Sequence, residues 1–505
     1  MARCDSCFGI INKNDLACYV CGEAIPGTES GKSWSALLPA WARAAGPSGI
    51  SLTVGRRIRD GVKASTSLTR ASFGPRRLEK PAAHMVGLAT NEPRATGRVF
   101  ADQRTWHILD TGSIWLKEFA RALGREVPTQ NWCPEIRSWG YCEDWEKTDQ
   151  VPDSGIEMTR FPLQRCYARF PVAQLFPFEK ALVERLKRKS PKPEFSTLIC
   201  TAPFYAPVAE LWPGRVVYYL TDLTKAYSGM NPKQIVALDR RMCRVASAVC
   251  PNSSRIANYL IHEAGCDPSK VTVIPNATRA QNVPDQPLTA PAPPPADMAG
   301  LPRPILGVLG NLAANMDWDL IASAVDKTPD VSWAFVGPTD MKIADPAHAR
   351  IRQDLLTRGG RIRFLGPKKY GELRDYARSF DVALMPYRKH EPTFSGSATR
   401  FYEHLAACRP ILSSRGFHEL LTKEPLLKLV DDAEGIAAAM ESLRRSGFRD
   451  GVEELRWRAS QDGTWSVRAR DLLEAASGTA RMKVASSNEL SCLGSYAEYP
   501  ALRRR

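Results

Sequence analysis

The sequence contains no long hydrophobic run. Within its 505 residues, no stretch approaches the roughly eighteen consecutive apolar residues that a membrane-spanning helix requires. The opening residues Ala2-Arg3-Cys4-Asp5 also do not resemble a secretory signal. Because neither a spanning helix nor an export signal is found, we expect the chain to stay in the cytosol.

The sequence also has no run in which aromatic residues alternate with Lys or Arg, as in a platform for single-stranded nucleic acid. The net charge is nevertheless +15. It fits three settings: an anionic membrane face, a solvated surface without a specific partner, or nucleic acid. With 44% hydrophobic and 24% charged residues the composition is that of a folded protein, and the length predicts two or three domains.

Cysteine is concentrated at the N-terminus. The pair Cys4-x2-Cys7 is followed ten residues later by the pair Cys18-x2-Cys21. Four thiolates at this spacing suit a tetrahedral zinc ion, and four protein ligands leave no open position for catalysis. We therefore predict a structural zinc-ribbon-like module in residues 1–30, which resembles the small zinc ribbons that dock proteins or nucleic acids. A redox pair, or cysteines that bind nothing, are the alternatives.

Residues 31–103 lack an apolar pattern long enough for a domain, and basic residues gather there. We interpret them as a basic, largely irregular linker. One segment, Trp34–Ala45, has apolar residues at helical spacing. It is either a transient helix within a flexible linker or a segment that docks on a membrane surface or a partner.

A regular pattern begins at Thr105, and we place a Rossmann-like domain at residues 104–283. Its predicted strands are Trp106–Asp110, Arg125–Gln130, Ser196–Cys200, Val216–Leu220, Ala248–Pro251 and Lys270–Pro275. Its predicted helices include Ile114–Leu123, ending at Gly124, and Arg255–Ala264. Strands that alternate with helices predict an α/β fold with a parallel sheet.

A proline-rich linker, residues 284–304 with eight prolines, separates this domain from a second Rossmann-like domain at residues 305–477. The second domain's predicted strands are Ile305–Leu309, Trp333–Val336, Ile362–Leu365, Asp381–Pro386 and Ile411–Ser413. The first three are followed by Gly310, Gly337 and Gly366. Glycine at a strand end exposes backbone amides that can cradle a diphosphate. We expect the basic tail, residues 478–505, to be disordered.

The most informative stretch is Phe380–Ser414. After a polar loop, a helical pattern begins at Ala398, with Phe401 and Leu405 on one face. Glu403 lies about 200° around the helix from Phe401, so it points away from that face. A carboxylate at this place can accept hydrogen bonds from the two vicinal hydroxyls of a ribose. Alternatively, it is an exposed glutamate favoured by the helix dipole.

This stretch resembles the donor-site segment of GT-B-fold glycosyltransferases, especially the retaining family 4, the glycosyl transferases of group 1. The similar residues are Arg400, Phe401-Tyr402-Glu403, Leu405-Ala406-Ala407 and Arg409-Pro410-Ile411. Further motifs of the family are similar to Pro251-Asn252-Ser253, to Val273-Ile274-Pro275-Asn276 and to a closing helix after Trp465. The resemblance therefore covers roughly residues 105–475. It implies two Rossmann-like domains that face a cleft. It also implies retaining, metal-independent transfer of a hexosyl group from a nucleotide diphosphate sugar to a glycan or lipid-linked acceptor, as in polysaccharide biosynthesis.

The resemblance implies roles for individual residues. Glu403 would hold the ribose, and Tyr402 lies in the same donor segment. Gly310, Asn311 and Arg400 would contact the diphosphate. Gly337 and Gly366 would form the base pocket. Gly112, Asn276 and Asp222 would lie on the acceptor side, where Asp222 either orients or deprotonates a hydroxyl or caps a helix.

The chain departs from the family at two places. Ser395 stands where the family has a glutamate near the sugar ring, and no Lys or Arg follows Gly310. Lys368, Arg388 or Arg400 would have to neutralise the diphosphate instead. These departures favour an inactive sugar-binding or scaffold protein as a second hypothesis.

A zinc-dependent, nucleic-acid-associated protein is the third hypothesis. It is suggested by the cysteine pairs and the basic charge. The sequence does not identify the sugar, the nucleotide or the acceptor. We expect a cytoplasmic protein, with a peripheral association at the inner membrane face if the acceptor is lipid-linked.

Overall fold

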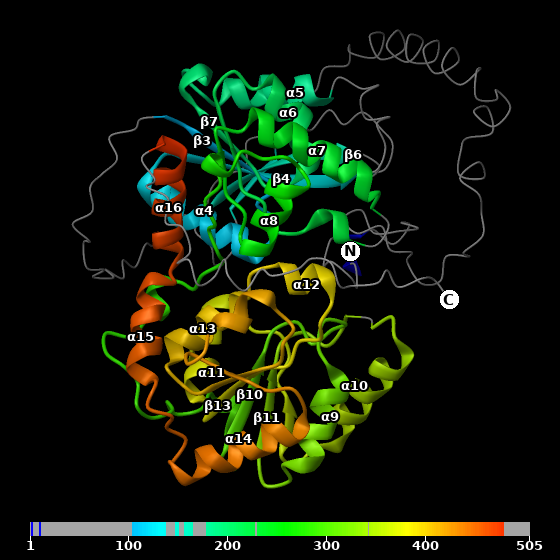
Figure 1. The fold of residues 1–505 in the computed structure, drawn as a ribbon, viewed down its shortest axis with the longest axis vertical. Helices are drawn as coiled ribbons and strands as arrows, with labels where there is room; N and C mark the ends of the chain where they lie inside the picture. The colour runs from blue at the N-terminus through cyan, green and yellow to red at the C-terminus, as the bar shows by residue number, and fades with distance from the viewer. Residues whose placement is uncertain are drawn as a thin grey trace, which may run out of the picture. The chain divides into compact units, whose positions relative to one another are not determined.

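The computed structural model describes residues 2–3, 10–11, 104–137, 147–150, 156–164, 178–227, 230–341 and 343–478. The four cysteines of the predicted zinc module, the basic linker and the tail after Gly478 lie outside these residues. Two short strands near the N-terminus, β1 (Ala2–Arg3) and β2 (Ile10–Ile11), pair antiparallel. The remaining described elements form two α/β domains, each built on one sheet (Figure 1).

The first sheet has seven strands in the order β5-β6-β4-β3-β7-β8-β9, and only the edge strand β5 runs antiparallel to its neighbour. The strands are β3 (Trp106–Leu109), β4 (Thr129–Arg137), β5 (Lys147–Gln150), β6 (Glu157–Gln164), β7 (Thr197–Cys200), β8 (Arg215–Tyr218) and β9 (Ala248–Val249). The main helices are α4 (Ile114–Glu126), α5 (Phe178–Arg188), α6 (Ala206–Leu211), α7 (Pro232–Val245) and α8 (Ser254–His262). Every residue of β3 and β7 is buried, as expected for a parallel sheet that is covered on both faces.

The second sheet has six parallel strands in the order β12-β11-β10-β13-β14-β15. The strands are β10 (Ile305–Leu309), β11 (Ser332–Val336), β12 (Ile362–Phe364), β13 (Val382–Met385), β14 (Ile411–Ser413) and β15 (Lys428–Leu429). The helices are α9 (Trp318–Lys327), α10 (Pro346–Arg358), α11 (Leu373–Ser379), α12 (Glu391–Ser395), α13 (Thr399–Ala407), α14 (Ala433–Arg445) and α15 (Glu453–Asp462). The strand order reverses beside β10, and ligands of open α/β sheets bind at the carboxyl ends of strands at such a point.

The last helix, α16 (Trp465–Ser477), returns to the first sheet and packs against α4 (Figure 1). Trp465 and Leu472 are buried in one hydrophobic cluster with Trp106 and Phe119 of the first domain. The closing helix after Trp465 thus crosses back from the second domain to the first.

Three local predictions need correction. Helix α4 continues through Gly124 to Glu126, so the strand predicted at Arg125–Gln130 starts only at Thr129. A helical glycine costs only about 1 kcal/mol relative to alanine, which the burial of Phe119 and Leu123 outweighs. The predicted strand Lys270–Pro275 forms one isolated bridge, between Val271 and Val249.

The loop before Ala398 was predicted to have no regular structure. It contains the short helix α12, with a proline in its first turn, where a missing N–H leaves no helical hydrogen bond unmade. Among the described helices, none is long and apolar enough to cross a membrane.

Candidate functional site

Three neighbouring strands of the second sheet end in glycines with positive φ. Gly310, Gly337 and Gly366 follow β10, β11 and β12 with φ of 140°, 155° and 70°. A Cβ on Gly337 would lie 1.7 Å from the carbonyl oxygen of Gly310, and the Gly337 N–H donates to the Gly366 carbonyl at 3.0 Å. The glycines therefore let three loop backbones meet at the carboxyl edge of the sheet. We call this place the glycine edge.

Arg400, in the first turn of α13, lies beside the glycine edge. A Cβ on Gly310 would be 4.0 Å from Cγ of Arg400 and 3.1 Å from the hydroxyl of Tyr387. Nη1 of Arg400 is buried and has no hydrogen-bond partner in the described part of the chain. A buried guanidinium N–H without an acceptor is costly, and an anion at the glycine edge would satisfy it.

The other two candidate cations differ from each other. Lys368 forms an ion pair with Asp297, with Nζ 2.7 Å from the carboxylate, so its charge is already engaged. The backbone N–H of Arg388 donates to the Asn315 carbonyl, and the side-chain Nε of Arg388 is buried without a described partner. Arg388 and Arg400 therefore remain available for an anion.

The stretch after Gly310 explains why no basic residue follows it. Asn311 is half-buried, whereas Leu312 and Ala313 are fully buried, and the N–H of Leu312 donates to the Pro338 carbonyl. A Lys or Arg at these buried positions would place a charge in the core. Arg400 of α13 instead places a cation beside Gly310.

Glu403 is buried, with only 3% of its surface exposed, so the alternative of an exposed glutamate is wrong. Its Oε2 accepts hydrogen bonds from the Thr278 hydroxyl at 2.8 Å and from Nδ2 of Asn282 at 3.0 Å, and its Oε1 accepts one from the Tyr370 hydroxyl. Burial raises the pKa of Glu403, while the charge of Arg400 and the three donors act in the opposite direction. Every residue of α13 from Phe401 to Ala407 is buried, so Glu403 does not lie on an unpacked face as predicted but points toward protein groups.

Two other residues of the donor segment are engaged by the protein. The hydroxyl of Tyr402 donates to Glu419, and its ring is buried in the core of the second domain. Ser395 is fully buried, and its hydroxyl donates to Oε1 of Glu391 at 2.7 Å and lies 3.0 Å from Nε of Arg255.

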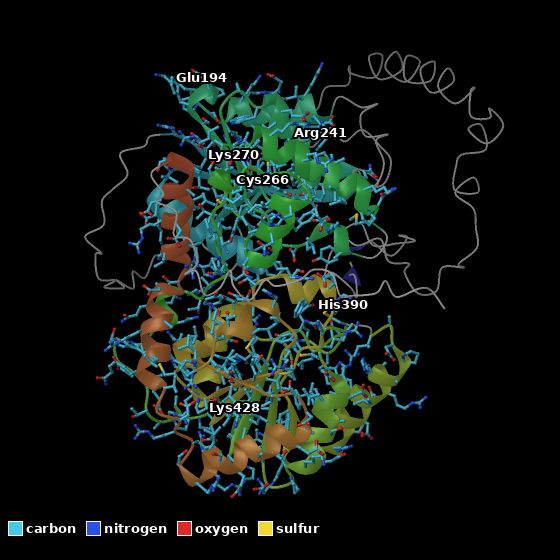
Figure 2. All side chains as sticks on the ribbon, in the orientation of Figure 1. Glu194, Arg241, Cys266, Lys270, His390 and Lys428 are labelled. Atoms are coloured by element: carbon cyan, nitrogen blue, oxygen red, sulfur yellow. The ribbon has the colours of Figure 1, made fainter. Side chains whose placement is uncertain are left out.

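Helix α12 joins the carboxyl edges of the two sheets. Arg255 of the first domain forms an ion pair with Glu391, and the Ser253 hydroxyl donates to the Ser395 carbonyl at 2.5 Å. The same helix contacts the short turn Thr224–Ala226, which follows Asp222. His390, at the N-terminus of α12, marks this region in Figure 2.

Asn276 also links the domains. Its backbone N–H donates to the Ser397 hydroxyl, and its Nδ2 donates to the Ser397 carbonyl and to the Thr399 hydroxyl. The two short motifs that contain Ser253 and Asn276 thus form hydrogen bonds that link the two domains. The sequence predicted their positions but not this role, because their partners lie more than 120 residues away.

The carboxyl edge of the first sheet carries carboxylates. Asp222 follows β8, and its carboxylate accepts from the hydroxyls of Tyr227 at 3.0 Å and Thr221 at 3.2 Å. These bonds replace the helix capping that was the alternative role of Asp222. Burial raises the pKa of Asp222.

A second carboxylate, Asp110, was not predicted. It follows β3 with φ of 65°, beside Gly112. Burial, with a contribution from the charge of Asp222, raises the pKa of Asp110 to about 6. The sequence did contain a signal, since Asp110 comes directly after a buried strand and Asp222 follows another strand within four residues. We call the region of Asp110 and Asp222 the acidic edge.

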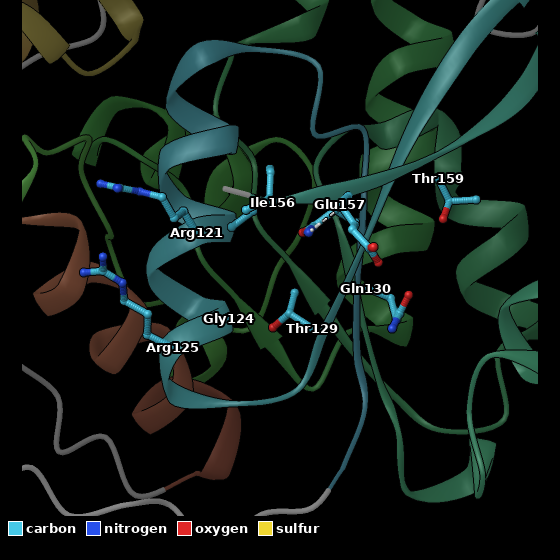
Figure 3. Close-up of a pocket in the computed structure, with 10 residues that line it drawn as sticks. Arg121, Gly124, Arg125, Thr129, Gln130, Ile156, Glu157 and Thr159 are labelled. Atoms are coloured by element: carbon cyan, nitrogen blue, oxygen red, sulfur yellow. Dashed lines mark hydrogen bonds between the residues drawn. The ribbon is translucent and has the colours of Figure 1, made fainter. Parts of the chain in front are cut away.

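A cavity of about 500 Å³ lies elsewhere, between α4 and the starts of β4 and β6. Figure 3 shows that the guanidinium groups of Arg121 and Arg125 point away from Thr129, Gln130 and Glu157. Because this cavity is at the amino ends of the strands, it is separate from both carboxyl edges. Within the described residues, no group of three His, Cys, Asp or Glu side chains could hold a metal ion.

Comparison with known proteins supports the fold. No family model matches the chain. The putative teichuronic acid biosynthesis glycosyltransferase TuaH of Bacillus subtilis is 21% identical over 248 residues, which cover 46% of this chain and 59% of TuaH. The chain thus spans about three fifths of the length of this curated relative.

Two solved structures illustrate the likeness in three dimensions. Sucrose-phosphate synthase from Thermosynechococcus elongatus matches with a TM-score of 0.54 and 17% identity, covering 74% of this chain and 98% of that one. The Anabaena protein HepE in complex with UDP-glucose matches with a TM-score of 0.52 and 15% identity, covering 74% and 99%. Together with the two parallel sheets, these matches show the GT-B glycosyltransferase fold.

Proposed function

We propose that the chain is a glycosyltransferase that moves a hexosyl group from a nucleotide diphosphate sugar to a glycan or lipid-linked acceptor. The observation that carries this proposal is the glycine edge with the unpartnered Nη1 of Arg400 beside it. The close backbone approach that these glycines allow, together with a buried guanidinium, is suited to a diphosphate, although the N–H groups of Gly310 and Gly337 themselves donate to the carbonyls of Val336 and Gly366. In this proposal Gly310, Asn311 and Arg400 bind the diphosphate, with Arg388 near them.

The nucleoside would extend from the diphosphate toward α13 and the neighbouring strand ends. Glu403, one turn after Arg400 on α13, would accept hydrogen bonds from the ribose hydroxyls. Gly337 and Gly366 would leave room for the base at the ends of β11 and β12. The chain's likeness to HepE, solved with UDP-glucose, supports a uridine nucleotide first among the candidates.

Transfer would break the bond between the anomeric carbon and the diphosphate oxygen and form a bond to an acceptor hydroxyl oxygen. The charge that develops on the leaving diphosphate would be stabilised by Arg400 and the backbone amides, without need of a metal ion. Asp222 would orient the acceptor hydroxyl or take its proton, with Gly112 lining the same edge. Retention of configuration is part of the proposal, and an inverted product in an NMR assay would contradict it.

The biological setting is proposed from the same likenesses. TuaH is named for the biosynthesis of a polysaccharide, which supports a polysaccharide or its lipid-linked precursor as the product. The net charge of +15 supports an association with an anionic membrane face. The zinc module at Cys4, Cys7, Cys18 and Cys21 stays a prediction, with a structural role and a docking function.

Calorimetric titration tests the donor site directly. We would titrate UDP, GDP, ADP and their glucose conjugates into the full chain, into Arg400→Ala and Glu403→Ala, and into Lys368→Ala as a matched control. We expect one nucleotide to bind the wild type, and its affinity to fall at least tenfold, about 1.4 kcal/mol, in the first two variants. Lys368→Ala should bind normally because Lys368 is paired with Asp297.

The outcome also separates the rival hypotheses. A nucleotide that binds without any release of nucleotide from its sugar conjugate would favour the inactive sugar-binding protein. If no nucleotide binds, the glycine edge is not a donor site and the proposal fails.

A further inference from the structure

The carboxylate proposed to hold the ribose already has protein partners. Both hydrogen bonds to Oε2 of Glu403 come from one short segment, residues 276–283, which we call the connector because it links the first domain to the proline-rich segment. The Thr278 hydroxyl and Nδ2 of Asn282 occupy the same oxygen and are themselves 3.0 Å apart. A ribose presents two neighbouring hydroxyls, so these two donors have the number and spacing of the groups that a nucleotide would bring.

There is also no free space at this carboxylate. Thr278 and Asn282 are 0% and 2% exposed. The gap beside Glu403 and Asn282, closed by Arg374, Arg378, Ala406 and Ala407, is too small for a water molecule. A ribose can therefore reach Glu403 only if the side chains of the connector turn away.

The backbone of the connector is held independently of Glu403. The N–H of Thr278 donates to the Gly463 carbonyl, and the Thr278 carbonyl accepts from Trp465, both at 2.9 Å. Arg279 forms a buried ion pair with Glu118 of α4, and its guanidinium carbon lies 4.7 Å from the ring centre of Tyr370. Side chains of the connector can therefore change partners while its backbone stays attached to the first domain.

We propose that Thr278 and Asn282 are specificity-determining residues of the donor site that compete with the ribose hydroxyls for Glu403. The free protein holds the carboxylate closed, and a nucleotide binds by replacing these two donors. Because the exchange replaces existing hydrogen bonds, the nucleotide's affinity is lower than its own contacts would give. This inference rests on the proposed function, since it requires Glu403 to be the ribose ligand.

The test uses paired variants and paired ligands. Thr278→Val keeps the shape of the side chain and removes the hydroxyl, and Asn282→Ala removes the second donor. Each would be titrated by calorimetry with UDP and with 2′,3′-dideoxy-UDP, which lacks both competing hydroxyls; if the nucleotide screen selects GDP or ADP, that diphosphate and its dideoxy form replace them. Thr328→Val is the matched control, because Thr328 is a buried threonine with its own hydrogen bonds at the amino end of β11.

We expect Thr278→Val and Asn282→Ala to bind UDP about threefold to tenfold more tightly than the wild type. Their affinity for dideoxy-UDP should change less than about twofold, and Thr328→Val should bind both ligands as the wild type does. UDP affinity that is equal or weaker in both variants would overturn the inference. A Glu403→Gln variant that binds UDP normally would instead refute the ribose contact of the proposed function.

A measurement on the unmodified chain covers the case in which the variants do not fold. The side-chain amide of Asn282 would be followed by NMR with and without saturating UDP. We expect its signals to shift when UDP binds, because Nδ2 then leaves the carboxylate of Glu403, and to shift much less with dideoxy-UDP. Unchanged side-chain signals with UDP would count against the competition.

Discussion

The glycine edge and the acidic edge occupy the same place in their respective sheets but carry different groups. In the second sheet, glycines with positive φ follow three strands, and Nη1 of Arg400 lies nearby without a partner among the described residues. In the first sheet, β3 and β8 are followed by Asp110 and Asp222. One edge therefore offers a close approach to the backbone and positive charge, and the other offers carboxylates.

This difference supports the proposed division of a transfer reaction between the two edges. The glycine edge suits a doubly charged diphosphate, whereas carboxylates would repel such a group and instead accept a hydrogen bond from a neutral hydroxyl. In the proposed function, two parallel sheets of similar construction would thus become a donor side and an acceptor side through the residues that follow their strands.

Among the residues of the glycine edge, we expect Gly337 to tolerate substitution least. In Gly337→Ala the new Cβ would lie 1.7 Å from the Gly310 carbonyl oxygen, at a φ of 155°. We expect the free energy of unfolding to fall by about 3 kcal/mol or more and nucleotide binding to be lost, as measured by denaturation and calorimetry. Gly359→Ala is the control, because Gly359 also has positive φ but nothing lies within 4 Å of its Cβ position, so it should cost only about 1 kcal/mol.

At the acidic edge, we expect Asp222→Asn to lower turnover while leaving the affinity for the donor nucleotide nearly unchanged. The amide keeps the size of the side chain but cannot take a proton from an acceptor hydroxyl. We expect turnover, measured as nucleotide release from the sugar conjugate with a glycan acceptor mixture, to fall about 100-fold. Nucleotide affinity should change less than about twofold, and an equal loss in both would contradict the division between the edges.

Substitution of Asp110 should have a smaller effect, a change in the free energy of unfolding that depends on pH. Its pKa of about 6 in the folded protein lies above the ordinary value of 3.8. The folded state therefore holds the Asp110 proton more tightly than the unfolded state, and the associated stability is present below pH 3.8 and lost as the pH rises through 6.

Asp110→Asn removes the stability loss that accompanies ionisation of the Asp110 carboxyl at higher pH. We expect the variant to be about 1–2 kcal/mol more stable than the wild type at pH 8, with no gain at pH 3.5, as measured by urea denaturation. Asparagine also tolerates the φ of 65° at this position. A stability difference that is constant with pH would show that the Asp110 carboxyl is not perturbed.

The sequence predicted the parts of the fold that local pattern determines. The second domain illustrates this, because β10 spans the predicted Ile305–Leu309 and the predicted glycines follow the first three strands. The start of β4 was misplaced because packing carries α4 through Gly124, whose low helix propensity had suggested an end.

The candidate site was only partly predictable for a different reason. The position of Glu403 on α13 follows from helical periodicity. Its partners Thr278 and Asn282 lie 125 and 121 residues earlier in the chain, and no local pattern reveals such contacts. Likewise, the choice of Arg400 over Lys368 required knowing that Lys368 is paired with Asp297.

The return of α16 to the first sheet means that the chain cannot be divided into two self-sufficient halves at its proline-rich segment. A fragment ending there would leave Trp106 and Phe119 without the cover of Trp465 and Leu472. The other fragment would carry α16 with an apolar side that has lost its partner. Cut at that segment, the two pieces should behave as complementary fragments that need each other to fold, although each contains a complete sheet.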